Sequence, residues 1–300
     1  MVAALGGNAL LKRGEPLEAT VQRQNVKRAA EALAPIATSH ELAITHGNGP
    51  QVGLLALESY AYREVGEYPL DVLGAESEGM IGYMIEQELA SRLPGRDTAV
   101  LLTQVAVDAD DPAFKNPTKP IGPWYDKDEA DRLHLDRGWS FVATGGQYRR
   151  VVPSPLPRRI LELRTIQLLI EAGVLVISVG GGGIPVVVSD DGLIRGVEGV
   201  IDKDRAAALL ARGLGADALL LLTDVDAVYA DWSSDNPRKL SDVTVEELQT
   251  LSFEAGSMGP KIEAACGFVK ETGGFAGIGA LEDAESILAG EAGTRIRSET

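Results

Sequence analysis

Cysteine is almost absent from this sequence. Cys266 is the one cysteine among 300 residues, which excludes an internal disulfide and a disulfide-stapled fold. Because 45% of the residues are hydrophobic, a chain of this length can bury a large core without such staples. We expect a protein of a reducing compartment, the cytoplasm, since residues 1–30 also show no basic-then-apolar stretch of the kind that marks a secretory signal.

Positive charge is also scarce. The 28 Lys and Arg residues are outnumbered by 44 Asp and Glu residues, which gives a formal net charge of −16. Such a charge repels nucleic acid and anionic membrane surfaces, and no basic cluster offsets it. No apolar run reaches the roughly 20 residues that cross a bilayer. We expect no nucleic-acid and no membrane partner, and we expect any phosphorylated substrate to be bound by a few individually placed lysines.

Several common catalytic patterns are missing. The histidines, His40, His46 and His134, are dispersed along the chain, and neither a Ser/His/Asp arrangement nor a Cys/His metal cluster is recognisable. A P-loop is absent, and the segment from Gly47 lacks the third glycine of the dinucleotide pattern, because Val52 stands there. The sequence therefore predicts no metal site built from side chains, and His46 is expected at best to orient its loop. Phosphoryl transfer needs positioning and positive charge rather than these groups.

Apolar strand-like runs alternate with stretches of helical period. This pattern predicts a mainly parallel sheet with helices on both faces and right-handed crossovers. Strands are predicted at Val2–Leu5, Leu42–Thr45, Thr98–Val107, Val174–Val179, Ala218–Leu222 and Phe275–Leu281. Helices are predicted near Thr20–Thr38, Gln51–Arg63, Glu76–Arg92, Leu161–Ala172, Arg205–Arg212, Val245–Leu251 and Ile262–Glu271. Ligands of such sheets bind beyond the carboxyl ends of the strands, so the residues just after each strand are the functional candidates.

The region Lys115–Pro157 breaks this alternation. It combines many prolines with short aromatic segments and shows no long helical period. We predict that it forms a small protruding lid subdomain. We interpret residues 1–300 as a single domain, in which residues 1–157, lid included, form the N-terminal half and residues 158–300 the C-terminal half.

Two predicted strand-to-helix turns are rich in glycine. The first strand runs into Gly6-Gly7-Asn8, and the second runs into Gly47-Asn48-Gly49. Glycine lets the backbone approach a ligand closely, and the free N–H groups of a helix start point at an anion. The alternative is that these residues only form tight turns. A third cluster, Gly180–Gly183, also ends an apolar strand, and its Gly181 and Gly182 leave nothing to obstruct a phosphate.

Two lysines lie at predicted helix starts. Lys203 and Asp204 stand directly ahead of an Ala-rich helix, and Met258-Gly259-Pro260 precedes Lys261 at a second one. A cation at a helix N-terminus opposes the helix dipole by about 0.3–1 kcal/mol, a cost that a bound anion removes. Both lysines are therefore candidate phosphate ligands. The alternative for Asp204 is a helix N-cap alone, and Cys266, on the apolar face of the second helix, is expected in the core.

Two further segments are candidates. Lys119 lies in the proline-rich segment Phe114–Pro123, whose restricted backbone would hold a lysine over a site. The alternative is an exposed proline-rich connector. Hydroxyl, carboxylate and aromatic groups that would suit a nucleoside follow the strand at 218–222, although they also fit a simple turn: Thr223, Asp224, Asp226 and Tyr229.

Taken together and in order, the motifs resemble those of the carbamate kinases, which belong to the amino-acid kinase family. The resemblance runs from Val2 to about Val269. It rests on Leu-Gly-Gly-Asn, His-Gly-Asn-Gly-Pro-Gln, Phe-Lys-Asn-Pro-Thr-Lys-Pro-Ile-Gly-Pro, Val-Val-Pro-Ser-Pro, Gly-Gly-Gly-Gly-Ile-Pro-Val-Val, Val-Ile-Asp-Lys-Asp and Pro-Lys-Ile-Glu-Ala-Ala.

The resemblance implies a three-layer αβα fold, usually a homodimer, that transfers a phosphoryl group reversibly between ATP and carbamate. Carbamoyl phosphate and ADP are the substrates in the ATP-forming direction, and we expect Mg²⁺ to be held mainly by the nucleotide phosphates. Together, turns and resemblance assign catalysis to Lys119, Lys203, Asp204 and Lys261, and carbamoyl and phosphoryl binding to Gly6, Gly7, Asn8, Gly47, Asn48 and Gly49. They assign nucleotide binding to Gly181, Gly182, Thr223, Asp224, Asp226, Tyr229, Met258 and Pro260.

Ala4 separates this hypothesis from its closest alternative. Many other amino-acid kinases, such as acetylglutamate kinase, have a catalytic lysine just before the Leu-Gly-Gly turn, where this chain has Ala4. The carbamate kinases look alike in this respect and use a lysine of the proline-rich lid, here Lys119. Two departures from their pattern bear on lid motion and nucleotide contacts: Gln147-Tyr148 stands where Gly-Trp is common, and Gly279-Ala280 stands where Thr-Ser is common.

Two alternative functions remain open. One is another amino-acid kinase that acts on a larger carboxylate, which would need specific polar contacts beyond the glycine turns. The other is a non-catalytic nucleotide-binding regulator of the same fold, which would be expected to have lost a phosphate-site lysine. The presence of Lys119, Lys203 and Lys261 argues against the second alternative.

Overall fold

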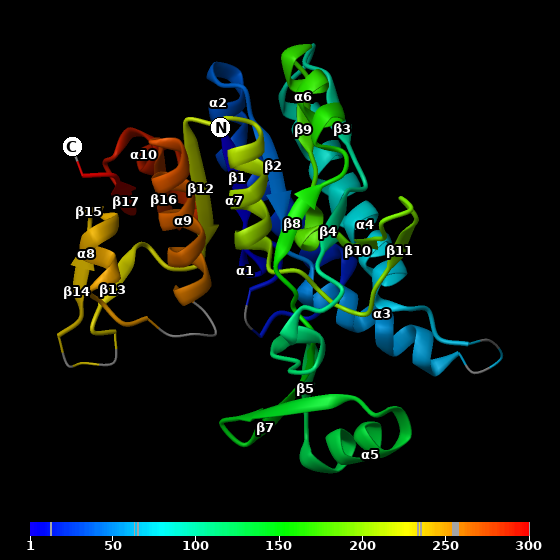
Figure 1. The fold of residues 1–300 in the computed structure, drawn as a ribbon. Coiled ribbons are helices and arrows are strands. Elements are labelled where there is room, and N and C mark those ends of the chain that lie inside the picture. Colours follow the sequence, from blue (N-terminus) through cyan, green and yellow to red (C-terminus); the bar gives the residue numbers. More distant parts are fainter. Residues whose placement is uncertain are drawn as a thin grey trace.

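The computed structural model describes residues 1–300 apart from 13, 63, 65, 233, 235, 254–257 and 300, and it describes the backbone but not the side chains of residues 8 and 9. The predicted helix end at Arg63 falls outside the described residues. Figure 1 shows the chain as a ribbon. No helix in the described part of the chain is long and apolar enough to cross a membrane.

A mainly parallel sheet forms the centre of the molecule (Figure 1). Its eight strands run in the order β15-β17-β16-β12-β1-β2-β9-β3, and the pairing of β16 with β17 is antiparallel. In the middle, Leu5 lies opposite both Leu222 and His46. The strands are β1 (Val2–Leu5), β2 (Ala43–His46), β3 (Thr98–Val100), β9 (Leu175–Ile177), β12 (Ala218–Thr223), β15 (Asp242–Thr244), β16 (Phe275–Ala280) and β17 (Thr294–Arg297).

Helices cover both faces of this sheet, because its strands are apolar on both sides. In β1, Val2 and Ala4 pack into one hydrophobic cluster, whereas Ala3 and Leu5 pack into the other. The first layer contains α6 (Leu163–Glu171), α7 (Lys203–Gly213), α8 (Val245–Gln249) and α9 (Met258–Thr272). The second contains α2 (Ala19–Ser39), α4 (Leu70–Arg92) and α10 (Ala284–Ala289). The predicted three-layer αβα fold is confirmed, as is the burial of Cys266.

One predicted strand is wrong, because Thr98–Val107 is two strands in two sheets. After β3, the chain leaves the central sheet, and the N–H of Thr103 donates to a carboxylate oxygen of Glu78 instead of to a strand. The chain then enters β4 (Gln104–Val107), which belongs to a second sheet of order β11-β10-β4-β8. The other strands of that sheet are β8 (Pro157–Ile160), β10 (Ile184–Val188) and β11 (Ile194–Gly196).

The lid protrudes from the body of the molecule, as Figure 1 shows at the bottom of the view. It holds a sheet of order β5-β7-β6, made of β5 (Lys119–Tyr125), β6 (Ser140–Thr144) and β7 (Gln147–Val152). No helix was predicted in this region, but α5 (Lys127–Arg137) lies between β5 and β6. Only Ala130 and Leu133 of α5 are buried, so its apolar period is weak, and its ends depend on the Asp126 cap and on Gly138 at φ 69°.

The lid is attached to the body through α3 (Gly49–Ala61). Gly53 of α3 packs directly on Gly122 of β5, so closely that a Cβ at Gly53 would overlap the Gly122 backbone. Tyr60, Tyr125 and Trp139 extend this contact into a small apolar cluster. The remaining elements are α1 (Gly7–Leu10), the short 3₁₀ turns at Pro112–Phe114, Gly180–Gly182 and Leu281–Asp283, and the hairpin of β13 (Val228–Ala230) and β14 (Arg238–Leu240).

Candidate active site

A cavity of about 250 Å³ lies beyond the carboxyl ends of the central strands. The turns after β1 and β2, the turn after β9 and the residues after β12 all contribute to its wall, together with the starts of α7, α9 and β5. The lining residues are Gly6, Gly7, Gly47, Asn48, Gly49, Pro50, Lys119, Pro120, Arg149, Gly181, Val200, Ile201, Asp202, Lys203, Asp204, Thr223, Asp224, Pro260 and Lys261.

Glycine is required in the first two turns because backbone approaches backbone there. The N–H of Gly6 donates to the carbonyl oxygen of Leu222 over 2.8 Å, and a Cβ at Gly6 would lie 2.8 Å from that oxygen. A Cβ at Gly47 would lie 3.2 Å from both the Gly7 nitrogen and Cδ of Lys203. These turns therefore bring backbone N–H groups to the cavity without side chains in the way. The side chain of Asn8, a predicted ligand, lies outside the described part of the structure.

Asn48 and Gly181 join the second and third glycine clusters. The Asn48 amide nitrogen donates to Oγ of Ser77 over 2.8 Å, and a Cβ at Gly181 would overlap the Asn48 side chain. Gly181 adopts a left-handed backbone with φ 68°, which glycine reaches without strain. His46, just before this turn, is fully buried, and burial lowers its pKa to about 4. Its Nδ1 lies 3.0 Å from the carbonyl oxygen of Gly47 and so carries the proton.

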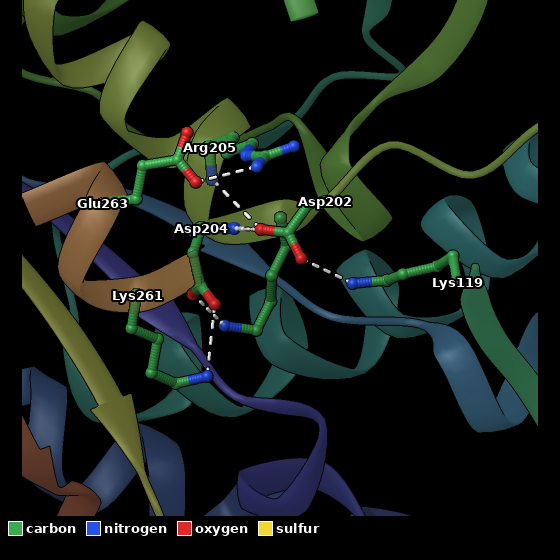
Figure 2. A network of polar contacts seen from close by, with 7 residues as sticks. Lys119, Asp202, Asp204, Arg205, Lys261 and Glu263 are labelled. Carbon is green, nitrogen blue, oxygen red and sulfur yellow. Dashed lines mark hydrogen bonds and ion pairs between the residues drawn. The ribbon is translucent and has the colours of Figure 1, made fainter. Parts of the chain in front are cut away.

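Lysines and carboxylates alternate across the cavity, as Figure 2 shows. Nζ of Lys203 lies 2.5 Å from Oδ1 of Asp204, and Nζ of Lys261 lies 3.1 Å from Oδ2 of the same carboxylate. On the lid side, Nζ of Lys119 lies 2.6 Å from Oδ2 of Asp202. The three lysines predicted from separate segments are therefore brought together, and the alternative of an exposed connector at Lys119 is not what the structure shows.

Asp202 rather than Asp204 caps α7, which corrects the N-cap alternative. Oδ1 of Asp202 accepts hydrogen bonds from the backbone nitrogens of Asp204 and Arg205, at 3.0 and 3.2 Å. Asp204 already lies in the first turn of the helix, where both of its oxygens face the lysines. The two carboxylates of the Val-Ile-Asp-Lys-Asp motif therefore have different roles. Asp202 caps the start of α7, and Asp204 pairs with two lysine ammonium groups.

The buried carboxylates of this network are each paired with lysine ammonium groups. Burial alone would raise the pKa of Asp204, but the ammonium groups of Lys203 and Lys261 outweigh it and hold that pKa below its ordinary value. Burial would also raise the pKa of Asp202, but the ammonium groups of Lys119 and Lys203 outweigh burial and leave that pKa lowered. Burial lowers the pKa of Lys203, and Asp204 counteracts this. Paired in this way, the charges are held in place for an anionic ligand.

Arg149 and Asp202 are functional candidates that the sequence did not single out. Arg149, on β7, lines the cavity, donates from Nε to the carbonyl oxygen of Gly122 over 3.2 Å and lies over the Trp124 ring. Burial lowers its pKa. With Arg149, four cationic side chains and three carboxylates line the cavity, so its formal charge is +1 in a chain of net charge −16. Its position beside the Val-Val-Pro-Ser-Pro motif was the available signal for Arg149.

Several residues predicted to bind nucleotide are not part of the cavity wall. Thr223 and Asp224 line it, and Oγ1 of Thr223 donates to Oδ1 of Asp224 over 3.1 Å. Asp226 instead pairs with Lys239 and accepts a hydrogen bond from Tyr229. Pro260 lines the cavity, whereas three other predicted residues do not: Gly182, Tyr229 and Met258. The described residues contain no group of three or more His, Cys, Asp or Glu side chains arranged for a metal ion.

Comparison with known proteins decides the family, since residues 1–274 match the amino acid kinase family. The chain belongs to the amino acid kinase family. Within it, the chain is 55% identical to the carbamate kinase of Haemophilus influenzae, covering 100% of this chain and 97% of that protein. It is 56% identical to the carbamate kinase of Rhizobium meliloti, with coverages of 99% and 93%. The resemblance read from the motifs is thus confirmed.

A solved structure of the same family agrees with this comparison. Carbamate kinase from Giardia lamblia bound to AMP-PNP superposes with a TM-score of 0.90 at 41% identity, covering 99% of this chain and 98% of that chain. The similarity therefore extends over the lid and both helical layers. The individual roles assigned to the site residues remain predictions.

Proposed function

We propose that this protein transfers a phosphoryl group reversibly between ATP and carbamate. In the ATP-forming direction, an oxygen of the ADP β-phosphate attacks the phosphorus of carbamoyl phosphate, and the bond from that phosphorus to the carbamate oxygen breaks. The products are ATP and carbamate, and carbamate decomposes to ammonia and CO₂. The high identity to carbamate kinases over the full length of the chain supports this reaction.

The position of Lys119 is the observation that carries the proposal. Ala4, buried in β1, offers no charge before the first glycine turn. The ammonium group of Lys119 enters the same cavity from the lid and lies 2.6 Å from Asp202. This replaces a lysine of the sheet by one of the lid, as the carbamate kinase pattern implies. Among the described residues of the site, nothing favours the larger carboxylate of another amino-acid kinase.

The cavity is arranged for two substrates that meet end to end. The carbamoyl side would be formed by the turns at Gly6-Gly7 and Gly47–Gly49, with Lys119 above them. The nucleotide phosphates would lie at Lys203 and Lys261, with Thr223 and Asp224 beyond. In the transition state, the oxygens of the transferred phosphoryl group carry negative charge between the carbamoyl side and the nucleotide side of the cavity. Lysines that are already in position stabilise this charge without having to move, and this lowers the barrier to transfer. A nucleoside extending from the cavity toward β13 would reach Asp226 and Tyr229.

We propose that Mg²⁺ enters the site with the nucleotide phosphates. The oxygens of Asp202 and Asp204 already accept from lysine ammonium groups or from backbone N–H groups. Mg²⁺ often keeps several waters and binds through phosphates rather than through an all-protein cage. It would add positive charge between the phosphate groups, and we expect no tightly bound metal in the free protein.

We further propose a cytoplasmic homodimer. A single buried cysteine suits a reducing compartment. Large apolar side chains are exposed on or beside α4, among them Met80, Tyr83 and Leu102. Leu102 lies close to this part of α4, since a Cβ at Gly79 would be 3.8 Å from it. Such a face would suit a second copy of the chain. Analytical ultracentrifugation should give a mass of about twice the 31.7 kDa chain.

The test of the reaction is a coupled assay of ATP formation. Purified protein, ADP, Mg²⁺ and carbamoyl phosphate should give ATP at a rate proportional to enzyme, and omission of ADP or chelation of Mg²⁺ should abolish the signal. Phosphorylation of acetylglutamate or aspartate without any reaction of carbamoyl phosphate would overturn the proposal.

A further inference from the structure

Two consecutive residues of α4 contact the second and third glycine clusters, although neither residue lines the cavity. Ser77 and Glu78 are fully buried. Oγ of Ser77 accepts from the Asn48 amide over 2.8 Å. Oε1 of Glu78 accepts from the backbone nitrogen of Gly180 over 2.7 Å, and Oε2 accepts from that of Thr103 over 3.2 Å. One turn of α4 therefore contacts both the Gly47–Gly49 turn and the Gly180–Gly183 loop.

The loop after β9 contains a strained residue. Val179 has φ 55° and ψ 31°, a left-handed backbone that a β-branched residue rarely adopts. Such a conformation costs on the order of 1–3 kcal/mol and persists only where surrounding contacts enforce it. Oγ1 of Thr103 accepts from the Val179 nitrogen over 3.0 Å, and Oγ1 of Thr45 donates to the Val179 carbonyl oxygen over 2.8 Å. Glu78 fixes the next backbone N–H, that of Gly180.

The loop has little room to relax once these contacts are lost. A Cβ at Gly181 would overlap Asn48, and a Cβ at Gly182 would lie 2.5 Å from the carbonyl oxygen of Ile201. Ile201 directly precedes Asp202 and Lys203. A shift of Gly180 would therefore carry Gly181 toward Asn48 and disturb the segment that presents Lys203 to the cavity.

We propose that Glu78 is a positioning residue, which holds the Gly180–Gly183 loop and the strained Val179 before it in place so that the transferred phosphoryl group fits between Asn48 and Lys203. This role rests on the phosphoryl transfer proposed above. Glu78 acts through the loop and does not itself enter the cavity wall. Filling the space behind the loop would require only an apolar side chain. The chain has a carboxyl group here instead, although burial raises the pKa of Glu78 to about 8 and the two backbone N–H donors only partly oppose that rise.

The chain offers a matched control in Glu162. Its carboxylate accepts from the backbone nitrogen of Gln104 over 2.8 Å, one residue from the Thr103 nitrogen that Glu78 binds. It therefore makes the same kind of bond on the same connection but does not touch the Gly180–Gly183 loop. Glu78→Gln leaves one of two backbone N–H groups without an oxygen acceptor, whereas Glu162→Gln removes one of two oxygens that both accept from Gln104. Only the first substitution should affect the loop.

The experiment compares these variants in steady-state kinetics and in hydrogen–deuterium exchange of residues 178–184. Glu78→Gln should lower kcat for ATP formation by roughly tenfold to a hundredfold, as expected for a small misplacement of reacting groups, and should speed exchange in that segment. Glu162→Gln should change neither by more than about twofold. Wild-type kcat and exchange in Glu78→Gln, or equal losses in both variants, would overturn the positioning role.

A second pair of variants keeps the test decisive if Glu78→Gln does not fold. Thr103→Val removes the hydroxyl that accepts from the Val179 nitrogen, whereas Thr103→Ser keeps it. We expect Thr103→Val to show the same lowered kcat and faster exchange, and Thr103→Ser to restore both; equal behaviour of the two contradicts the proposal. A wild-type protein without carbamoyl phosphate activity would refute the proposed function instead, while the exchange data would still test the hold on the loop.

Discussion

Lys119, Lys203 and Lys261 are held by different neighbours, so their removal should have different effects. Lys203 and Lys261 share Asp204 at the helix starts, whereas Lys119 pairs with Asp202 from the lid. Loss of a preorganised charge typically lowers kcat by about 10²–10³. Lys203→Ala and Lys261→Ala should show at least this loss together with weaker ADP binding. Lys119→Ala should impair the use of carbamoyl phosphate while ADP binding stays nearly intact.

Calorimetry of ADP binding, paired with steady-state rates, measures this division. Two other lysines provide controls. Lys127 is exposed on helix α5 of the same lid as Lys119, and Lys270 lies in the last turn of α9, the helix that begins near Lys261. Their alanine variants should behave like wild type. Full turnover of Lys119→Ala at ordinary carbamoyl phosphate concentrations would remove the catalytic role of the lid lysine and, with it, the argument from Ala4.

Single residues also show what the sequence could and could not reveal. Glycine turns after strands and lysines at helix starts can be recognised in a sequence, because purely structural roles rarely explain them together. Most of the glycines and lysines predicted in this way line the cavity. Arg149 was missed because an arginine on a strand carries no local signal of its role beyond its position two residues before the Val-Val-Pro-Ser-Pro motif. Which of two nearby carboxylates caps α7 depends on backbone geometry, and so Asp202 and Asp204 could not be separated by spacing alone.

At the scale of elements, the contact of α3 with the lid should control the position of Lys119. Gly53→Ala would force a Cβ into the backbone of Gly122, where no side chain can move aside. The lid must then shift, and a misplacement of about 1 Å can cost roughly a hundredfold in rate. We expect kcat/KM for carbamoyl phosphate to fall about tenfold to a hundredfold, with ADP affinity unchanged by calorimetry.

Gly74→Ala is the matched control, because Gly74 also lies inside a helix and a Cβ there meets nothing within 4 Å. Alanine favours helix over glycine by about 1 kcal/mol, so this variant should be as active as wild type and slightly more stable. If Gly53→Ala keeps wild-type kcat/KM, the close contact does not set the lid position.

Helices and strands could be located from the sequence where one face or the whole element is buried and therefore apolar. Strands such as β1 and β12 are fully buried apolar runs, and both were located from sequence to within one residue. The split of Thr98–Val107 was missed because Thr103 and Gln104 are only a short polar interruption of the run, and the contact that ends the first strand comes from Glu78, 25 residues earlier, which binds the Thr103 nitrogen. Helix α5 escaped notice because most of its side chains face solvent.

For the whole molecule, the two buried ionisable groups behind the site predict how stability depends on pH. Burial raises the pKa of Glu78 to about 8, with Glu162 nearby adding to the rise, and burial lowers the pKa of His46 to about 4. Both side chains surround Gly180, since a Cβ there would meet Glu78 and His46. The folded state thus favours a neutral Glu78 and a neutral His46, and the two groups act in opposite directions on stability.

The sign follows from the protons bound in each state. Between the ordinary carboxyl pKa and about 8, the folded protein holds a proton on Glu78 that the unfolded chain releases, so this contribution to stability is lost as pH rises. His46 lowers stability only as pH falls from about 6.5 toward 4. From about pH 6.5 to pH 8, Glu78 should therefore reduce the free energy of unfolding by roughly 1.4 kcal/mol per pH unit, about 2 kcal/mol in all.

Urea unfolding of wild type and Glu78→Gln at several pH values isolates this term, because the other titrating groups, including the N-terminal amine, are common to both proteins. The free energy of unfolding of the variant relative to wild type should rise by about 2 kcal/mol between about pH 6.5 and pH 8 and level off above the pKa of Glu78. Parallel pH dependences in the two proteins would mean that Glu78 is ionised in the folded state throughout this range. In that case its two backbone donors, rather than burial, dominate its pKa.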